Sequence, residues 1–196
     1  MKKVILTAVA VAAVFSAKAQ DTWTVDKAHT SVNFSVTHLL ISEVDGQFKN
    51  FEGTVISKSP DFVGAEISFT VDINSISTDN EMRDNHLKSD AFFDAAKFPK
   101  MTFKSVSFTK VSGNKYALTG DLTIRDVTKR VTFDVTYGGT VKDGYGNTKA
   151  GFKATTVINR FDYGLKWNAL TEAGGAVVGQ DVTITINVEV AKDKKK

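Results

Sequence analysis

Apolar and polar residues alternate along most of this chain with a period of two, which is the pattern of a half-buried β-strand. In residues 31–37, Val32, Phe34 and Val36 share one face of the predicted strand, and the residues between them are polar. The same alternation recurs in residues 67–73, 115–124, 131–137, 152–158 and 182–190. The pattern therefore predicts a protein built almost entirely from strands.

Two further strands are predicted where the alternation changes phase. Phe48 and Phe51 fall on opposite parities, and so do Phe103 and Phe108. We interpret both places as β-bulges, where one strand carries an extra residue. Residues 23–25 add a short leading strand. Turn residues are expected to join the strands at Asp45-Gly46, Ser112-Gly113-Asn114, 126–129 and 143–147.

Each predicted strand has one apolar and one polar face, which is typical of an antiparallel sheet with a single buried side. Eight such strands can fold into a two-sheet sandwich or close into a barrel. We favour an all-β fold, an eight-stranded antiparallel β-barrel, because closure leaves no exposed strand edge. A barrel of about eight strands encloses either a packed interior or one ligand.

Two segments break the alternation. Residues 79–95 are polar, permit one short helix, and bring Arg83, His86 and Phe92 into a short stretch. Residues 161–180 contain four glycines and predict a long loop before the last strand. We expect the first segment to plug, gate or line the β-structure that it interrupts. Long loops in compact domains are often functional, so we expect a functional role for the second segment as well.

The first nineteen residues are expected to form a cleaved signal peptide, cut after Ala19. Two lysines precede an apolar run over residues 4–15, and residues 17–19 form a small-x-small cleavage site. The run is shorter than the roughly 20 residues needed to span a bilayer. We therefore expect secretion, most simply to a bacterial periplasm, and one domain over residues 20–196.

Charge and composition narrow the range of partners. The chain has 25 basic and 22 acidic residues, and three of the basic ones are lysines of the predicted signal peptide, so the mature net charge is about zero. Such a balance argues against nucleic acid as a partner. The lysine-rich C-terminal end leaves transient contact with a membrane surface open, and the oligomeric state, a homodimer included, is also open. The absence of cysteine excludes disulfides and thiol chemistry.

Candidate catalytic and metal-binding groups are few. The three histidines, His29, His38 and His86, lack the spacing of metal ligands, and we expect no metal site. Arg83 and Asp84 beside His86 could support acid–base chemistry, but no nucleophile-elbow motif accompanies any serine. We therefore expect no catalytic residue, and an enzyme using these three groups is the less favoured alternative.

Phenylalanines are the stronger indication of function. Thirteen of the 14 follow residue 19. Those on the presumed inner faces are Phe34, Phe48, Phe69, Phe103, Phe133 and Phe152. Together with Phe92, which adjoins the helical segment, they are candidate ligand-binding residues, although plain core packing also explains such rings. A buried methylene contributes about 0.8 kcal/mol and association costs roughly 4–15 kcal/mol, so this lining favours a long-chain ligand.

An ordered set of motifs spans nearly all of residues 20–196. The motifs are Trp23-x-Val25-Asp26, His29-x-Ser31-Val32-x-Phe34-x-Val36-x-His38, Gly46-x-Phe48, Ser75-Ile76-x-Thr78-x-Asn80, Arg83-Asp84-x-His86-Leu87, Phe92-Phe93-Asp94, Phe98-Pro99, Gly120-x-Leu122-Thr123-Ile124, Arg160-x-Asp162-Tyr163-Gly164 and Val178-Gly179-x-x-Val182. With this set the chain resembles the YceI family, exported lipocalin-like proteins described as polyisoprenoid-binding. Asp126 stands where a glycine is common in that family.

The resemblance implies an eight-stranded lipocalin-like barrel with a small helix and a hydrophobic tunnel that holds an isoprenoid or another long amphiphile. It implies no shared catalytic residue, and no cofactor is expected other than bound lipid. The apolar lining that it implies places candidates at Phe34, Phe69, Phe103, Phe133 and Ile158.

We hypothesise an exported carrier of a long-chain isoprenoid-type lipid, a polyisoprenoid or an isoprenoid quinone. The tail would thread through the interior, and the head group would lie at a rim near residues 79–95 or 161–180. His38, Arg83 and His86 are the candidate head-group residues. The alternative is a partner-binding stress-response protein whose core is filled by side chains.

Overall fold

The structure is a computed structural model that describes residues 20–172 and 174–194. The predicted signal peptide, residues 1–19, lies outside the described residues. Within the described part of the chain, no helix has both the length and the apolar character needed to cross a membrane.

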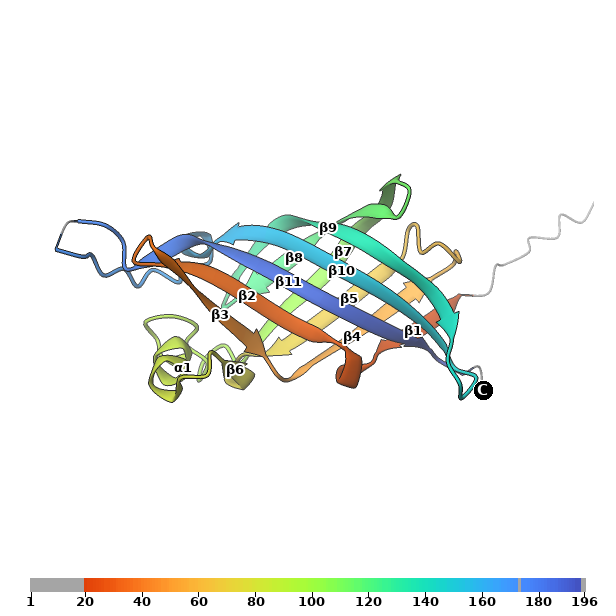
Figure 1. Ribbon diagram of the computed structural model, residues 1–196, viewed down its shortest axis with the longest axis horizontal. Helices are drawn as coiled ribbons and strands as arrows, with labels where there is room; N and C mark the ends of the chain where they lie inside the picture. The colour runs from red at the N-terminus through yellow and green to blue at the C-terminus, as the bar shows by residue number, and fades with distance from the viewer. Residues whose placement is uncertain (1–19, 173, 195–196) are drawn as a thin grey trace, which may run out of the picture.

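Eleven antiparallel strands form one sheet (Figure 1). They are β1 (Asp21–Val25), β2 (Ser31–His38), β3 (Ser42–Phe48), β4 (Phe51–Ser57), β5 (Glu66–Asp72), β6 (Ile76–Ser77), β7 (Lys100–Ser112), β8 (Lys115–Ile124), β9 (Val127–Lys142), β10 (Thr148–Asn159) and β11 (Val178–Lys192). One α-helix, α1 (Glu81–Lys88), lies between β6 and β7, and short 3₁₀ helices cover Lys27–His29, Ile73–Ser75 and Arg160–Tyr163.

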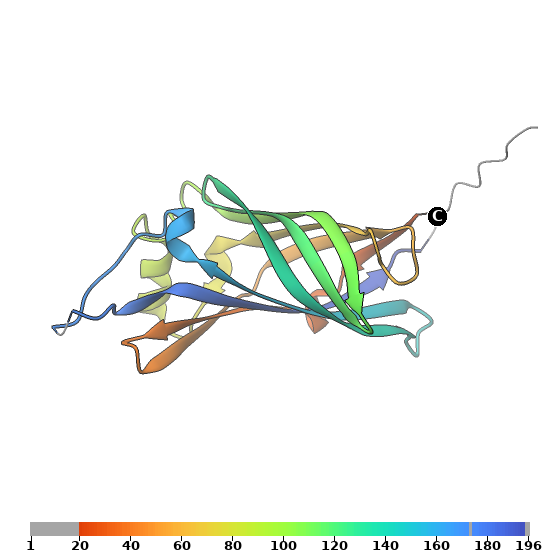
Figure 2. The same cartoon turned by 90° about the horizontal axis from the view of Figure 1, so that it is seen from above.

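The sheet closes because β11 pairs with β1 as well as with β10 and β2. At three of the eight strand positions around the barrel, two short strands take the place of one long strand. The first of these positions holds β1 and β2, which both pair with β11. The second holds β4, which pairs with β1, and β3, which pairs with β2. The third holds β5, which pairs with β4, and β6, which pairs with β3. With β7 to β11 this makes eight strand positions around the barrel (Figures 1 and 2). The predicted eight-stranded antiparallel barrel with one helix is confirmed.

Two details of the strand pattern differ from the prediction. Phe48 and Phe51 do not flank a bulge, because β3 ends at the first and β4 begins at the second. Asp45-Gly46 is not a turn but lies inside β3, and the chain turns at Leu39 and Leu40 instead. The predicted bulge in the 103–108 strand is confirmed by a register shift between Ser105 and Ser107.

A polar network stabilises the seam where the barrel closes. The Lys149 ammonium on β10 donates hydrogen bonds to the carboxylates of Asp26 and Glu189. Asp26 also accepts from Ala28 N–H and contacts His29 Nδ1 at 3.1 Å. The network therefore joins the end of β1 to β10 and β11, the strands that meet at the seam.

Replacing Asp26 by asparagine is expected to lower the free energy of unfolding at neutral pH. Hydrogen bonds from Lys149 and then His29 hold the pKa of the Asp26 carboxyl well below its ordinary value. Such a carboxylate stabilises the fold above its unfolded-state pKa of about 4 and loses that effect as the pH falls below it. Urea unfolding across a pH series should show the difference between the two proteins shrinking in acid, and a difference that stays constant would contradict this role.

Candidate functional site

The closed part of the barrel contains an apolar cavity. Side chains from β1, β2, β4, β5, β7, β8, β9, β10 and β11 line it, together with Phe62 from the β4–β5 loop. Of the 22 lining residues, only Thr54, Ser68 and Thr102 carry a polar side chain, and none is charged. The space inside the cavity that the centre of a water-sized sphere can reach is about 110 Å³. Such a narrow, apolar space suits an extended hydrocarbon chain.

Three inward-facing glycines keep this interior open. A β-carbon added at Gly53 would lie 2.4 Å from the Phe69 ring, and one at Gly120 would lie 2.3 Å from the Phe103 ring. At Gly46 the same atom would meet the ring of Phe34 at 2.2 Å. Each ring therefore lies flat on the wall, over a neighbouring strand that has no side chain there. The rings line the interior without filling it.

Replacing Gly53 by alanine is expected to push the Phe69 ring into the cavity. The new β-carbon would also lie 2.9 Å from Val25 Cγ2, and overpacking of this kind typically lowers stability by about 1–3 kcal/mol. Gly151→Ala is the matched control, because Gly151 also lies in a strand and an added β-carbon would meet no atom within 4 Å. Denaturant unfolding and uptake of an apolar dye measure both effects, and equal results for the two variants would contradict the wall-packing role.

The structure brings four of the predicted ligand-binding residues together. Phe69, Phe103, Phe133 and Phe152 line the cavity. Phe69, Phe103 and Phe152 point inward yet are only partly buried, since part of each ring faces empty space. Whether they contact a ligand stays a prediction.

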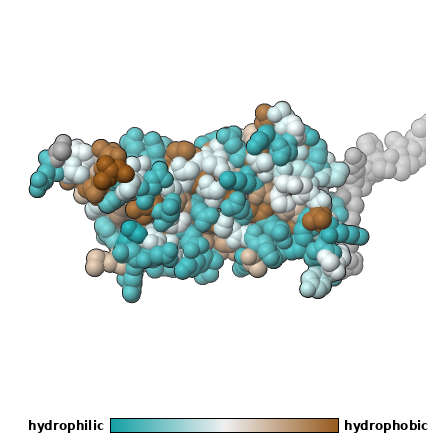
Figure 3. Space-filling view, viewed as in Figure 1, coloured by the Kyte–Doolittle hydropathy of each residue, from teal (hydrophilic) through white to brown (hydrophobic). Residues whose placement is uncertain are grey.

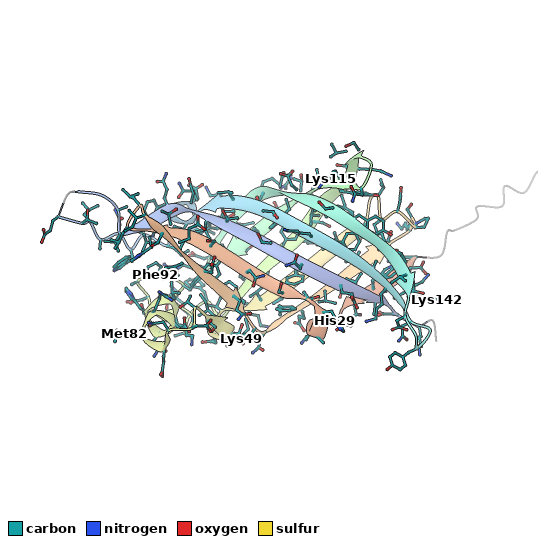
Figure 4. The ribbon with its side chains drawn as sticks, in the orientation of Figure 1. His29, Lys49, Met82, Phe92, Lys115 and Lys142 are labelled. Atoms are coloured by element: carbon teal, nitrogen blue, oxygen red, sulfur yellow. The ribbon has the colours of Figure 1, made fainter. Side chains whose placement is uncertain are left out.

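The other four predicted residues do not line the cavity. Phe48 packs against Phe34 with ring centroids 5.7 Å apart and against Phe93 at 6.0 Å. Phe48, Phe92 and Ile158 are buried, with 5%, 5% and 8% of their surface exposed. Phe34, Phe48 and Ile158 belong to the apolar core, and Phe92 lies at the end of the barrel that carries α1 (Glu81–Lys88) (Figure 4).

Phe62 closes the opposite end of the cavity, and the sequence reasoning missed it. Its ring is 1% exposed and packs against Trp23 and Phe152 at centroid distances of 5.0 and 5.1 Å. The residue lies in a loop with φ of 64°, a conformation that is rare for a bulky side chain. A lone phenylalanine within a turn-rich segment, after Pro60-Asp61, was the available signal.

At the α1 end, the 161–180 loop is held onto the barrel by Arg160. The guanidinium is 4% exposed and donates four hydrogen bonds to backbone carbonyls. Its acceptors are Leu165 at 2.6 Å, Trp167 at 2.7 Å, Gly179 at 2.8 Å and Val178 at 3.1 Å. Burial lowers the pKa of Arg160 from its usual value, although an arginine keeps its charge in proteins.

An aromatic cluster covers this end. Trp167 packs against Phe92 at 5.4 Å and against the His86 ring at 5.3 Å, and His86 packs edge-on against Phe92 at 5.1 Å. Both irregular segments, 79–95 and 161–180, therefore meet at one rim. No sequence pattern indicates that Trp167 and Arg160 lie at this rim, and only the fold brings them together there.

Arg83 and Asp84 are engaged in holding the chain before the helix. Asp84 accepts hydrogen bonds from Thr78 N–H at 2.8 Å and from Thr78 Oγ1 at 2.6 Å. Arg83 donates to the Oγ1 and the carbonyl of the same threonine, each at 2.7 Å. The side chain of Asn80 caps the helix by accepting from Arg83 N–H. These contacts fix the backbone, and His86 shares none of them.

The three histidines lie in different parts of the barrel. His29 precedes β2 and His38 ends it, so the eight-residue strand separates them by roughly 25 Å. His29 does lie near Asp26 and Glu189 in a group that could offer ligand atoms to a metal ion. However, Lys149 already donates to both carboxylates, and we assign this group to the seam.

A closed antiparallel barrel with an apolar interior and a helix-covered rim defines a lipocalin-like class of protein. Residues 23–190 match the YceI-like domain family, and the chain belongs to this family. A UPF0312 protein of Staphylococcus aureus is 40% identical over 168 residues, which cover 85% of this chain and 95% of that protein.

Solved structures share the fold. A Campylobacter jejuni YceI protein is 35% identical with a TM-score of 0.69, covering 87% of this chain and 96% of its own. Burkholderia cenocepacia BcnA has a TM-score of 0.74 at 24% identity, covering 84% and 98%. A domain from Saccharophagus degradans, described as polyisoprenoid-binding, has a TM-score of 0.65 at 14% identity, covering 87% and 98%. The last two show likeness of fold alone.

Proposed function

We propose that this protein is an exported carrier that holds a long-chain isoprenoid-type lipid, a polyisoprenoid or an isoprenoid quinone, in its barrel. The observation that carries the proposal is the narrow apolar cavity, in which about 110 Å³ is open to the centre of a water-sized sphere. The polyisoprenoid-binding description of the Saccharophagus degradans domain, which has the same fold, agrees with this choice of ligand.

The lining supports a lipid tail over a polar ligand. Polar ligands need fixed hydrogen-bonding or charged partners. Thr54, Ser68 and Thr102 carry the only hydroxyl groups among the 22 lining residues, and each alternates with inward-facing neighbours on its strand, so its hydroxyl points away from the cavity. Each buried methylene gains about 0.8 kcal/mol, so a tail of about ten carbons gains roughly 8 kcal/mol. The head group would then lie at the rim formed by residues 79–95 and 161–180, where His86 is exposed.

Native mass spectrometry of the mature protein, purified from the periplasm of its own host and followed by organic extraction, tests the proposal. A stoichiometric adduct that extracts as an isoprenoid or a quinone would support it and identify the cargo. A bare protein mass that also ignores added long-chain lipids would contradict it.

A bare mass would favour a partner-binding stress-response protein. The cavity argues against that alternative, since the interior is not filled by side chains. An enzyme using Arg83, Asp84 and His86 is less favoured, because the first two are committed to Thr78.

A further inference from the structure

One end of the barrel carries exposed aliphatic side chains that the cavity does not use. In the β2–β3 turn, Leu39, Leu40 and Ile41 are 39%, 68% and 85% exposed, and Leu170 in the 161–180 loop is 63% exposed. We call these four residues the apolar tip. Figure 1 shows the turn and the loop projecting together beyond the barrel wall, and Figure 3 shows hydrophobic surface at that end.

The turn is built at a conformational cost. Leu39 and Leu40 have φ values of 52° and 62°, in the left-handed region that disfavours bulky side chains. Tight hairpin turns with positive φ prefer asparagine or glycine. The chain instead places two leucines there and leaves them exposed. Asparagine or glycine would adopt this conformation with less strain. Backbone strain that is retained at such a position indicates a role outside folding.

The loop holds the turn in place, so the apolar tip is a defined surface. Leu39 N–H donates to the Val177 carbonyl at 2.9 Å. Leu170 pairs with Ala176 across the loop, and a β-carbon at Gly175 would lie 3.2 Å from Leu40 Cδ1. The loop backbone therefore packs against one end of the Leu40 side chain, while most of that side chain stays exposed.

The size and chemistry of the apolar tip indicate what covers it. Four residues are far fewer than the roughly 20–30 that each partner contributes to a stable protein interface. The tip has no aromatic or arginine anchor of the kind that dominates such interfaces. The exposed charged residues close to it in sequence, Glu43, Glu172 and Lys166, give no excess of positive charge that would attract anionic head groups. Small projecting aliphatic groups of this kind can enter the interfacial layer of a bilayer.

We propose that the apolar tip inserts into the surface of a lipid bilayer and sets this end of the barrel against the membrane. The proposal rests on the lipid-carrier function and names the surface from which the cargo is taken. Because the aromatic rim lies at the same end, the rim would face the bilayer. The last described residues lie at the opposite end of the barrel (Figure 1), and Lys192 and Lys194 would then lie away from the membrane.

Flotation of the mature protein with phosphatidylcholine vesicles, and with vesicles that also contain phosphatidylglycerol, tests this docking. The wild-type protein should float with both. The double variant Leu40→Asn, Ile41→Asn should float roughly tenfold less or weaker still, since it loses two aliphatic insertions. Asparagine suits the left-handed position, so the fold is kept. Val141→Asn is the control, because Val141 is 65% exposed near the other end.

Equal flotation of the double variant and the wild type would overturn the docking. Flotation that needs phosphatidylglycerol and disappears when the C-terminal lysines are removed would overturn it too, as would a dimer that the double variant dissociates. Native mass spectrometry of the double variant loaded with long-chain lipid from detergent micelles separates the two proposals. Normal loading with lost flotation supports both, whereas an empty wild-type barrel contradicts the carrier function whatever the flotation shows.

Discussion

Replacing Phe69 by aspartate is expected to abolish the retention of lipid by the barrel. The Phe69 ring lines the cavity, stacks on Phe51 at 5.8 Å and covers Gly53. A carboxylate there would either be buried without a partner or draw water into the cavity. Burying an unpaired charge costs several kcal/mol, which is comparable to the roughly 8 kcal/mol that a ten-carbon tail gains. Native mass spectrometry with organic extraction measures the bound lipid.

The matched control is Val157→Asp. Val157 lies on β10 of the same barrel but faces outward and is 60% exposed, so its carboxylate would stay in water. This variant should retain lipid as the wild type does. Circular dichroism must show that the Phe69 variant is still folded. A folded Phe69→Asp protein that retains its lipid would show that the tail does not occupy this cavity.

Replacing Arg160 by methionine is expected to lower the free energy of unfolding by several kcal/mol. The change keeps most of the apolar stem but removes four hydrogen bonds to backbone carbonyls. Each buried carbonyl left without a donor costs about 1–3 kcal/mol. Amide hydrogen exchange should also accelerate across residues 165–179, because the loop loses the group that holds it to the barrel.

Arg130→Met is the control for this prediction. Arg130 pairs with Asp121 at 2.7 Å on the exposed surface, where its side chain is 55% exposed. Exposed surface pairs of this kind contribute little to stability, so denaturant unfolding should change little. Similar losses in the two variants would show that Arg160 acts through its charge in general rather than through the loop carbonyls.

The barrel could be predicted from the sequence because its signal is local. In a strand that buries one face, alternate residues such as Val32, Phe34 and Val36 must all be apolar. The resulting pattern lies in neighbouring residues of one segment, so it can be recognised without knowing the partner strand. The short helix and the long loop were predicted for the same reason, since both interrupt the alternation.

Features that depend on the partner strand were not predictable in this way. Gly46 follows an aspartate and was interpreted as part of a turn, but its role is to leave room for the ring of Phe34 on β2. An isolated glycine inside an alternating segment does signal close approach of another group. Phe62 closes one end of the cavity, and Arg160 holds the 161–180 loop to the barrel. Both roles depend on where loops return to the barrel, which no local sequence pattern predicts.

The pairing of β1 with β11 also determines when the barrel can be completed. Trp23 lies opposite Lys192, so nearly the whole chain must be available before the ring closes. Pairings between residues so distant in sequence form slowly, and until they form the edges of β1 and β10 remain free to pair with other chains. A chain whose synthesis stops before β11 would therefore form an open, aggregation-prone sheet rather than a smaller barrel.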